Sequence, residues 1–150
     1  MKLELTESTI MDEIEAAKDT LMRIQLMRVG LKLDDFGTGH SSLSYLRTLP
    51  FDSLKIDQSF VERLPADKES RAIIETMINL ARALRMNVVA EGIENERQVN
   101  ELIDLGCETG QGFFFSKPLE AEAAERLLAA SIKDGSWLGK DGFQPSRTLA

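Results

Sequence analysis

The sequence predicts an α/β fold in which about five parallel strands alternate with helices. Short apolar segments alternate with amphipathic helical segments along the whole chain, which is typical of a parallel sheet with right-handed crossovers. The 150 residues give about 30 residues per strand–helix step, and eight such steps would need roughly 250 residues, the usual size of a closed eightfold barrel. We therefore expect either an open five-stranded sheet or a barrel whose front end is missing.

Five segments have the length and apolar content of buried strands, at residues 3–6, 31–34, 54–57, 88–91 and 112–115. Helical patterns lie near residues 8–24, 43–46, 74–84, 99–103 and 120–132, with apolar residues three or four positions apart. Ser8 or Thr9 is expected to cap the first helix, and Gly30 stands where that helix should stop. Residues 1–133 are expected to form the domain, and residues 134–150 a loosely ordered tail.

The composition excludes some classes of protein. The net charge of −7, from 25 acidic and 18 basic residues, argues against binding of a DNA or RNA polymer, which needs a basic surface. No apolar run reaches the roughly 20 residues that cross a bilayer, and the amino-terminal residues lack the apolar core of a signal peptide. We expect a cytoplasmic chain without direct membrane insertion, whose parent protein could still be membrane-anchored. Cys107 is the only cysteine, and packing is its expected role.

Charged side chains stand near the ends of the expected strands. They are Glu4, Asp34, Lys55 and Glu91. Side chains alternate between the two faces of a strand, so each should point away from the apolar residues of its own strand. In a parallel sheet flanked by helices, active groups gather at the carboxyl ends of the strands. We expect these side chains to share one side of the sheet, with Asp35 at its rim.

This cluster predicts metal-assisted hydrolysis. Three or four carboxylates repel one another unless a counter-ion joins them, and Mg²⁺ and Mn²⁺ take oxygen ligands of this kind. A lysine among the carboxylates suggests a held water molecule or an anionic substrate. Two adjacent metal ions would suit an in-line attack on a phosphodiester.

Simpler readings are open for each residue. An Asp-Asp pair before a glycine loop, as at Asp34 and Asp35, is often only a turn signal. Lys55 and Asp57 could form a surface ion pair worth about 0–1 kcal/mol. Glu91, which precedes Gly92, could simply cap the next helix. Only the occurrence of all these residues at strand ends favours a common site.

The motifs resemble those of the EAL family of cyclic-di-GMP phosphodiesterases. The matching blocks are LELTES at 3–8, DDFGTG at 34–39, LKID at 54–57, VVAEGIE at 88–94, and the segment from Gln111 to Leu119 that contains Gln-Gly and Ser-Lys-Pro-Leu. They occur in the family's order and with similar spacing, and the resemblance covers residues 1 to about 130. It implies a TIM-type barrel, here a partial one from the carboxyl-terminal part of the domain, with a two-metal site for Mg²⁺ or Mn²⁺.

The resemblance also implies roles for individual residues in the hydrolysis of cyclic-di-GMP to the linear dinucleotide. Glu4 and Asp34 would bind metal, and Asp35 would bind the second metal or bridge the pair. Lys55 would hold the attacking water. Glu91 would ligate metal or serve as general base.

Other residues would bind substrate or support the site. They are Glu7, Phe36, Gly37, Thr38, Gly39, Asp57, Glu94 and Gln111. Glu7 would steady the 36–39 loop, which shapes substrate binding in the family and often the dimer contact. Gln111 would support the water and metal cluster, and Glu94 lies on the loop that follows Glu91.

The sequence departs from the family pattern in two ways. The family's glutamate in the Glu-Ala-Leu block and an asparagine on a later strand do not occur in this sequence, because both belong to the part of the barrel before Leu3. In addition, His40 stands where the family usually has tyrosine. Three hypotheses are open: a phosphodiesterase, a non-catalytic module that binds nucleotide or protein, and an inactive fragment. An open sheet would leave the outer edge of its first strand without a partner strand. Because a second copy of the chain could cover this edge, we also expect a homodimer.

Overall fold

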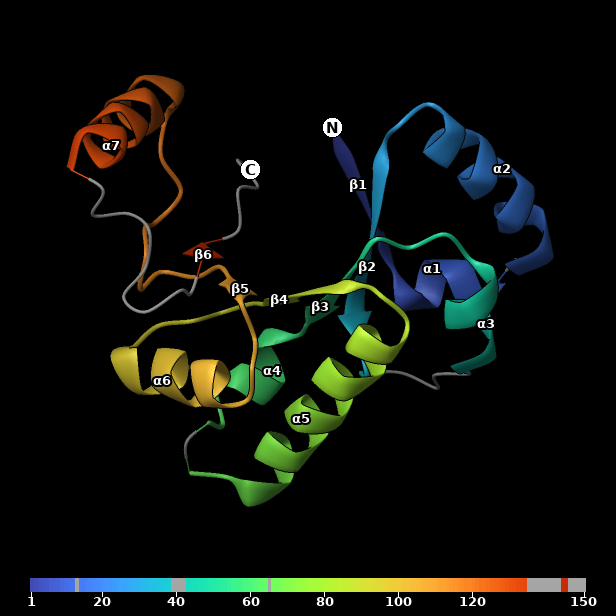
Figure 1. The fold of residues 1–150 in the computed structure, drawn as a ribbon, viewed down its shortest axis with the longest axis horizontal. Coiled ribbons are helices and arrows are strands. Elements are labelled where there is room, and N and C mark those ends of the chain that lie inside the picture. The colour runs from blue at the N-terminus through green and yellow to red at the C-terminus, as the bar shows by residue number, and fades with distance from the viewer. Residues whose placement is uncertain (13, 39–42, 65, 135–143, 146–150) are drawn as a thin grey trace.

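The computed structural model describes residues 1–12, 14–38, 43–64, 66–134 and 144–145 (Figure 1). Its strands are β1 (Lys2–Thr6), β2 (Gly30–Phe36), β3 (Ser53–Ile56), β4 (Asn87–Ala90), β5 (Thr109–Gly110) and β6 (Gln144–Pro145). They form one six-stranded sheet in the order β1-β2-β3-β4-β5-β6, with every neighbouring pair parallel. The parallel sheet that the alternation of segments predicts is therefore present.

Helices connect these strands. They are α1 (Glu7–Asp12), α2 (Ile14–Leu26), α3 (Leu43–Thr48), α4 (Gln58–Val61), α5 (Lys68–Ala83), α6 (Glu96–Asp104) and α7 (Ala121–Asp134). The first expected helix corresponds to α1 and α2, on either side of residue 13. It begins directly at Glu7, so neither Ser8 nor Thr9 precedes it as a cap. None of the described helices has the length and hydropathy needed to cross a bilayer.

The prediction of a strand at residues 112–115 is wrong. The strand of this region is the short β5, and residues 112–115 form a turn in which the Phe115 N–H donates to the Gly112 carbonyl at 3.1 Å. Gly112 lies against the backbone of Ile93, where an added Cβ would be 2.1 Å from the Ile93 carbonyl oxygen. This close approach holds the chain in the turn, although the apolar run resembles a buried strand.

The loose tail expected at residues 134–150 stays a prediction. Within that range the structure describes Asp134, which is the last residue of α7, and Gln144–Pro145, which pair with β5. The other residues of that tail lie outside the described part of the chain. In Figure 1, α7 stands apart from the helices that cover the sheet.

The main core lies between the sheet and its helices. In Figure 1, α4, α5 and α6 lie along one side of the sheet. Leu33, Leu54 and Ile56 on the strands are fully buried there, and α5 contributes buried residues such as Ile74 and Ala81. Burying each large apolar side chain stabilises the fold by about 1.5–3 kcal/mol. The other side of the same strands carries charged residues, and the candidate site lies on that side.

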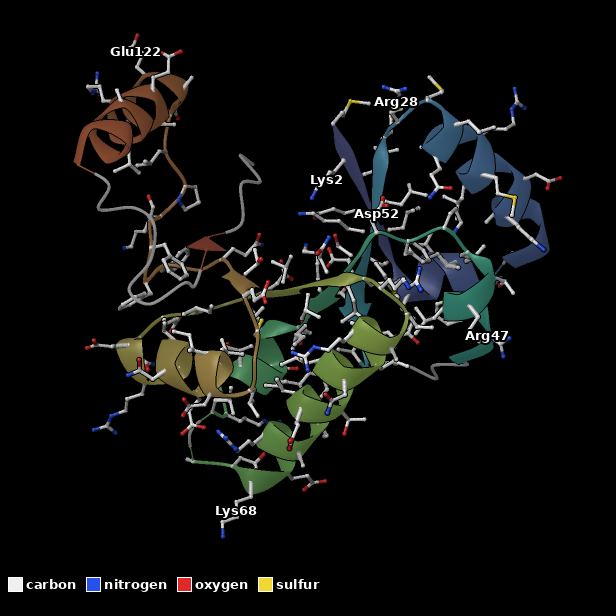
Figure 2. All side chains as sticks on the ribbon, in the orientation of Figure 1. Lys2, Arg28, Arg47, Asp52, Lys68 and Glu122 are labelled. Atoms are coloured by element: carbon white, nitrogen blue, oxygen red, sulfur yellow. The ribbon has the colours of Figure 1, made fainter. Side chains whose placement is uncertain are left out.

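The strands β1 and β2 start at the same edge of the sheet. Lys2 and Asp52, both labelled in Figure 2, lie beside Gly30 at the amino end of β2. The Asp52 carboxylate accepts a hydrogen bond from the Leu31 N–H at 2.8 Å, which fixes the start of β2. Since all strands are parallel, their carboxyl ends meet at the opposite edge, where strand-end side chains are brought together.

Candidate functional site

The register of the sheet places the charged residues on one side. Glu4 lies directly opposite Lys32 in the β1–β2 pair, and Thr6 lies opposite Asp34. In the β3–β4 pair Lys55 lies opposite Val89, two residues before Glu91. Because side chains of partnered residues on parallel strands point the same way, these charged groups face one space.

Lys55 is the centre of this cluster. Its ammonium donates to Glu4 Oε2 at 2.8 Å and to Asp34 Oδ2 at 2.9 Å, and it lies 2.8 Å from Glu91 Oε1. The Lys55 side chain is only 4% exposed. The reading of Lys55 as part of a surface ion pair is therefore wrong, and three strand ends are joined through one buried cation.

The hydrogen bonds of Lys55 also fix its charge. Burial alone would lower the pKa of the Lys55 ammonium, but the hydrogen bonds that it donates to Glu4, Glu91 and Asp34 outweigh burial and raise the pKa well above its ordinary value. Lys55 is therefore protonated at neutral pH, and it can act as a fixed hydrogen-bond donor but not as a proton acceptor.

The carboxylates around Lys55 differ from one another. Burial pushes the pKa of Glu4 upward, but the hydrogen bonds from Lys55 and Lys32 reverse this, so that the pKa falls below its ordinary value. Burial raises the pKa of Glu91, with a further contribution from the charges of Asp34 and Glu4, against the opposing effect of Lys55. Glu91 is the better proton acceptor of the two, because its pKa is raised whereas that of Glu4 is lowered.

Gln111 fixes the position of Glu91. The Gln111 side-chain amide donates to Glu91 Oε1 at 2.5 Å, the same oxygen that Lys55 contacts. Backbone bonds place Gln111 there, because its N–H donates to the Ala90 carbonyl at 2.8 Å and its carbonyl accepts from the Ile93 N–H at 3.1 Å. The alternative in which Glu91 only caps a helix is wrong, because Asn95 is the N-cap of α6.

Asp34 and Asp35 lie at the end of β2. The Asp35 N–H donates to Asp34 Oδ1 at 3.0 Å, and Asp35 has a left-handed backbone with φ of 56°. Burial and the nearby charges of Asp34 and Asp57 raise the pKa of Asp35. Asp57 itself caps α4, since its carboxylate accepts from the Ser59 N–H at 2.9 Å.

The loop after β2 is held by Glu7. The buried Glu7 carboxylate accepts a hydrogen bond from the Gly37 N–H at 3.1 Å. Gly37 has φ of +92°, a conformation that favours glycine. Thr38 Oγ1 donates to the Asp35 carbonyl at 2.8 Å, and Phe36 is part of the core.

Other expected site residues lie elsewhere. Gly39 and His40 fall outside the described residues. Glu94 is exposed, and its backbone N–H donates to Gln98 Oε1 at 2.8 Å. Cys107 is buried, which raises the pKa of its thiol to about 11 and agrees with a packing role.

Sequence reasoning missed Lys32. This lysine is only 1% exposed, and its ammonium lies 3.1 Å from Glu4 Oε1. The alternation of side chains could have found it, because Lys32 precedes Asp34 by two residues and so shares its side of β2. Sequence reasoning also missed Tyr45, whose phenol has its pKa raised by burial and by the nearby charge of Glu7.

The carboxylates around Lys55 have the donor atoms that a divalent cation requires. Glu4, Asp34 and Glu91 supply hard oxygen donors from three strands that converge on one point, which fits Mg²⁺ or Mn²⁺ in chemistry. Within the described ranges, no group of three or more His, Cys, Asp or Glu side chains forms a ready-made ion site. The carboxylates instead close around the Lys55 ammonium, so an ion would have to share them with that cation.

Comparisons with known proteins agree on one family. A model of the EAL domain matches residues 1–118. Cyclic di-GMP phosphodiesterase NbdA of Pseudomonas aeruginosa is 43% identical over 130 residues, which cover 87% of this chain and 17% of NbdA. The solved structure of PaMucR phosphodiesterase in a c-di-GMP complex is 44% identical with a TM-score of 0.78, and the match covers 82% of this chain and 50% of that one.

A manganese and cy-diGMP complex of Klebsiella pneumoniae BlrP1 is 29% identical with a TM-score of 0.73, over 77% of this chain and 30% of that one. The chain therefore spans half the length of the PaMucR structure and a smaller share of the other two proteins.

Proposed function

The chain belongs to the EAL domain family, and we propose that it supplies the carboxyl-terminal part of a site that hydrolyses cyclic-di-GMP to the linear dinucleotide. The family's domains are TIM-type barrels, and the open sheet from β1 to β6 forms part of such a barrel. One observation carries the proposal: Lys55 joins carboxylates from three other strand ends around a single buried ammonium.

In the proposed reaction Lys55 holds the attacking water. Its raised pKa keeps the ammonium charged. Its three N–H groups face Glu4, Asp34 and Glu91 in the structure, so donation to the water oxygen would replace one of these contacts. Glu91 either receives the proton of that water or ligates metal. The raised pKa of Glu91 favours proton acceptance near neutral pH, and Gln111 holds the carboxylate in orientation.

Divalent cations belong to the proposal as cofactors. Glu4, Asp34, Asp35 and Glu91 would hold two ions of Mg²⁺ or Mn²⁺. When bound, such ions neutralise phosphate charge and activate water. The manganese complex of BlrP1 supports this assignment. The remaining residues position the site: Glu7 holds the loop at Gly37, where the substrate is expected to bind.

A binding or inactive module is the second candidate. It is favoured by the length of the match, since the chain corresponds to half of the PaMucR phosphodiesterase structure. It is also favoured by the absence, within the described residues, of a ready-made ion site. In that case the chain would bind the nucleotide or a protein without turning it over.

The partner and the location also remain proposals. β1 is the first strand of the sheet, and among the described strands only β2 pairs with it. Leu3 on β1 is 39% exposed, and Met22 and Leu26 on α2 are exposed as well. A second copy could cover this edge, so we propose a homodimer, to be tested by light scattering: a monomer across the concentration range would contradict it.

A cytoplasmic location is proposed from the acidic composition and the single cysteine.

The decisive experiment is hydrolysis of cyclic-di-GMP by residues 1–150. The chain is first shown to be folded by circular dichroism and is then incubated with Mn²⁺ or Mg²⁺, with products separated by chromatography. Release of the linear dinucleotide, reduced about 100-fold or more by Glu91→Ala, would support the enzyme, since removing one catalytic group typically costs this much. Glu108→Ala removes an exposed carboxylate and should leave the rate unchanged.

The alternative outcomes separate the candidates. A folded chain that binds cyclic-di-GMP without hydrolysing it would favour the binding module. A folded chain that neither binds nor hydrolyses the nucleotide would favour the inactive fragment, and would assign the activity to a longer protein.

A further inference from the structure

We propose that Lys32 is a second internal counter-ion of the site, which pairs with Glu4 and thereby weakens the binding of a divalent cation there. Lys32 lies on β2, and its side chain is 2% exposed. The pairing with Glu4 stands by itself, whereas the effect on cation binding rests on the proposed function.

The pairing follows from the register of the sheet. Glu4 and Lys32 are direct partners in the parallel β1–β2 pair, so their side chains lie on the same face of the sheet. The Lys32 ammonium lies 3.1 Å from Glu4 Oε1, while Glu4 Oε2 accepts from Lys55 at 2.8 Å. Each oxygen of Glu4 therefore has its own ammonium, and the carboxylate is fixed from both sides.

The charge balance of the cluster shows the consequence. Among the residues joined by ion pairs, Lys32 and Lys55 carry two positive charges and Glu4, Asp34 and Glu91 carry three negative ones, which leaves a net charge of −1. Asp35, the fourth proposed ligand, is not part of this set of ion pairs and would add the same charge with or without Lys32. Without Lys32 the same cluster would have a net charge of −2. Divalent-cation affinity rises with the negative charge of the ligands, and salt screens a buried charge only weakly. Lys32 should therefore oppose an incoming cation more than any exposed lysine does.

A purely structural role would give a different result. If the Lys32 stem only filled space between strands, methionine would replace it with little effect on Glu4 or on ions, because the two side chains have similar length and apolar surface. Lys32→Met therefore removes the charge while keeping most of the packing. Lys68→Met is the matched control, since Lys68 is exposed at the start of α5, far from the sheet in Figure 2.

The first measurement is a double-mutant cycle without metal. Wild type, Lys32→Met, Glu4→Gln and the double variant are unfolded in urea with a chelator present. If the two residues are coupled, the double variant is more stable than the sum of the single effects by about fivefold or more in the unfolding equilibrium constant, within the usual range for contacting residues. Additive effects would overturn the pairing.

The second measurement is a titration with Mn²⁺ alone, in which free Mn²⁺ is counted by electron paramagnetic resonance. Lys32→Met should bind the ion about tenfold more tightly than wild type, because the variant lacks one positive charge beside a ligand and affinity rises with the negative charge of the ligand set. Lys68→Met should match wild type. Unchanged or weaker binding by Lys32→Met would overturn the effect on cations.

A third outcome separates this inference from the proposed function. If none of the three chains binds Mn²⁺, the proposed metal site of this chain is refuted, and the effect of Lys32 on cations falls with it. The double-mutant cycle still decides the pairing of Lys32 with Glu4, because it contains no metal.

Discussion

Leu54 and Lys55 are neighbours on β3, and both are buried, with 0% and 4% exposure. Leu54 faces the core between the sheet and its helices, whereas Lys55 faces the charged residues on the other side of the sheet. The two faces of one strand therefore have the same burial and opposite chemistry. Burial alone does not distinguish a core from a site, and the partners of the buried group do.

The two faces also contribute differently to stability. Apolar burial on the Leu54 face is favourable without any partner geometry. An ion cluster such as that of Lys55 must first lose the hydration of its charges, and replacing such a cluster by well-packed apolar residues is often neutral or stabilising. Stability alone therefore gives no reason for the charged face, which agrees with a functional role for it.

The largest expected effect is on the apolar face. Leu54→Ala should lower the free energy of unfolding by about 2–5 kcal/mol, because the fully buried side chain leaves a cavity. Urea unfolding measures this. Glu75→Ala, at an exposed position of α5, is the control and should change stability by no more than about 0.5 kcal/mol. Equal effects of the two variants would contradict the assignment of Leu54 to the core.

The next effect is expected at the loop that follows Glu91. Gly92 has φ of +68°, and an added Cβ would lie 2.4 Å from the Gln58 Cβ. Gly92→Ala should therefore destabilise the fold by about 1–3 kcal/mol. At Gly30 the nearest atom to an added Cβ is the flexible Lys2 Cγ at 3.2 Å, so Gly30→Ala should be tolerated. A tolerated Gly92→Ala would mean that the loop can move away from α4.

On the charged face, Lys55→Met should destabilise the fold by about 1–2 kcal/mol at pH 7, less than a fully buried ion pair would, because its carboxylate partners are partly exposed. Its effect should depend on pH. Burial already raises the pKa of Glu91, and loss of the ammonium raises it further. A carboxyl group whose pKa is raised by folding stabilises the folded state at low pH and loses that contribution as the pH rises.

The difference between wild type and Lys55→Met should therefore shrink between pH 7 and pH 5. Urea unfolding of both proteins at the two pH values measures it. A difference that stays constant over this range would show that the carboxylates do not depend on Lys55.

The smallest effect is expected from Ser53, also on the charged face. Its hydroxyl is buried, and no hydrogen-bond partner for it occurs in the described part of the chain. Ser53→Ala should therefore be neutral or stabilising by up to about 1 kcal/mol. Ser70 is equally buried but donates to Asp67 at 2.5 Å, so Ser70→Ala should destabilise by about 1 kcal/mol. Thermal unfolding of both variants compares them, and a clear loss of stability in Ser53→Ala would reveal an unseen partner.

Much of this arrangement could be predicted from alternation along the strands. The period of two predicts that Glu4, Asp34 and Lys55 lie on one side of the sheet. In the structure the Lys55 ammonium lies 2.8 Å from Glu4 Oε2 and 2.9 Å from Asp34 Oδ2. The same rule also places Lys32 on this side, because it precedes Asp34 by two residues on β2. It could not identify residues 112–115 as a turn, because the close packing of Gly112 on Ile93 joins segments far apart in the sequence.

By itself, the sequence determined the parallel α/β architecture, the family, and which charged residues belong to one face, because all three depend on local periodicity and on motif order. Only the tertiary structure decided the contacts. It closed three carboxylates around Lys55, placed Lys32 opposite Glu4, and set Gln111 against Glu91. These contacts depend on the register between strands, and register is fixed by packing across the whole sheet, which no single segment of sequence encodes.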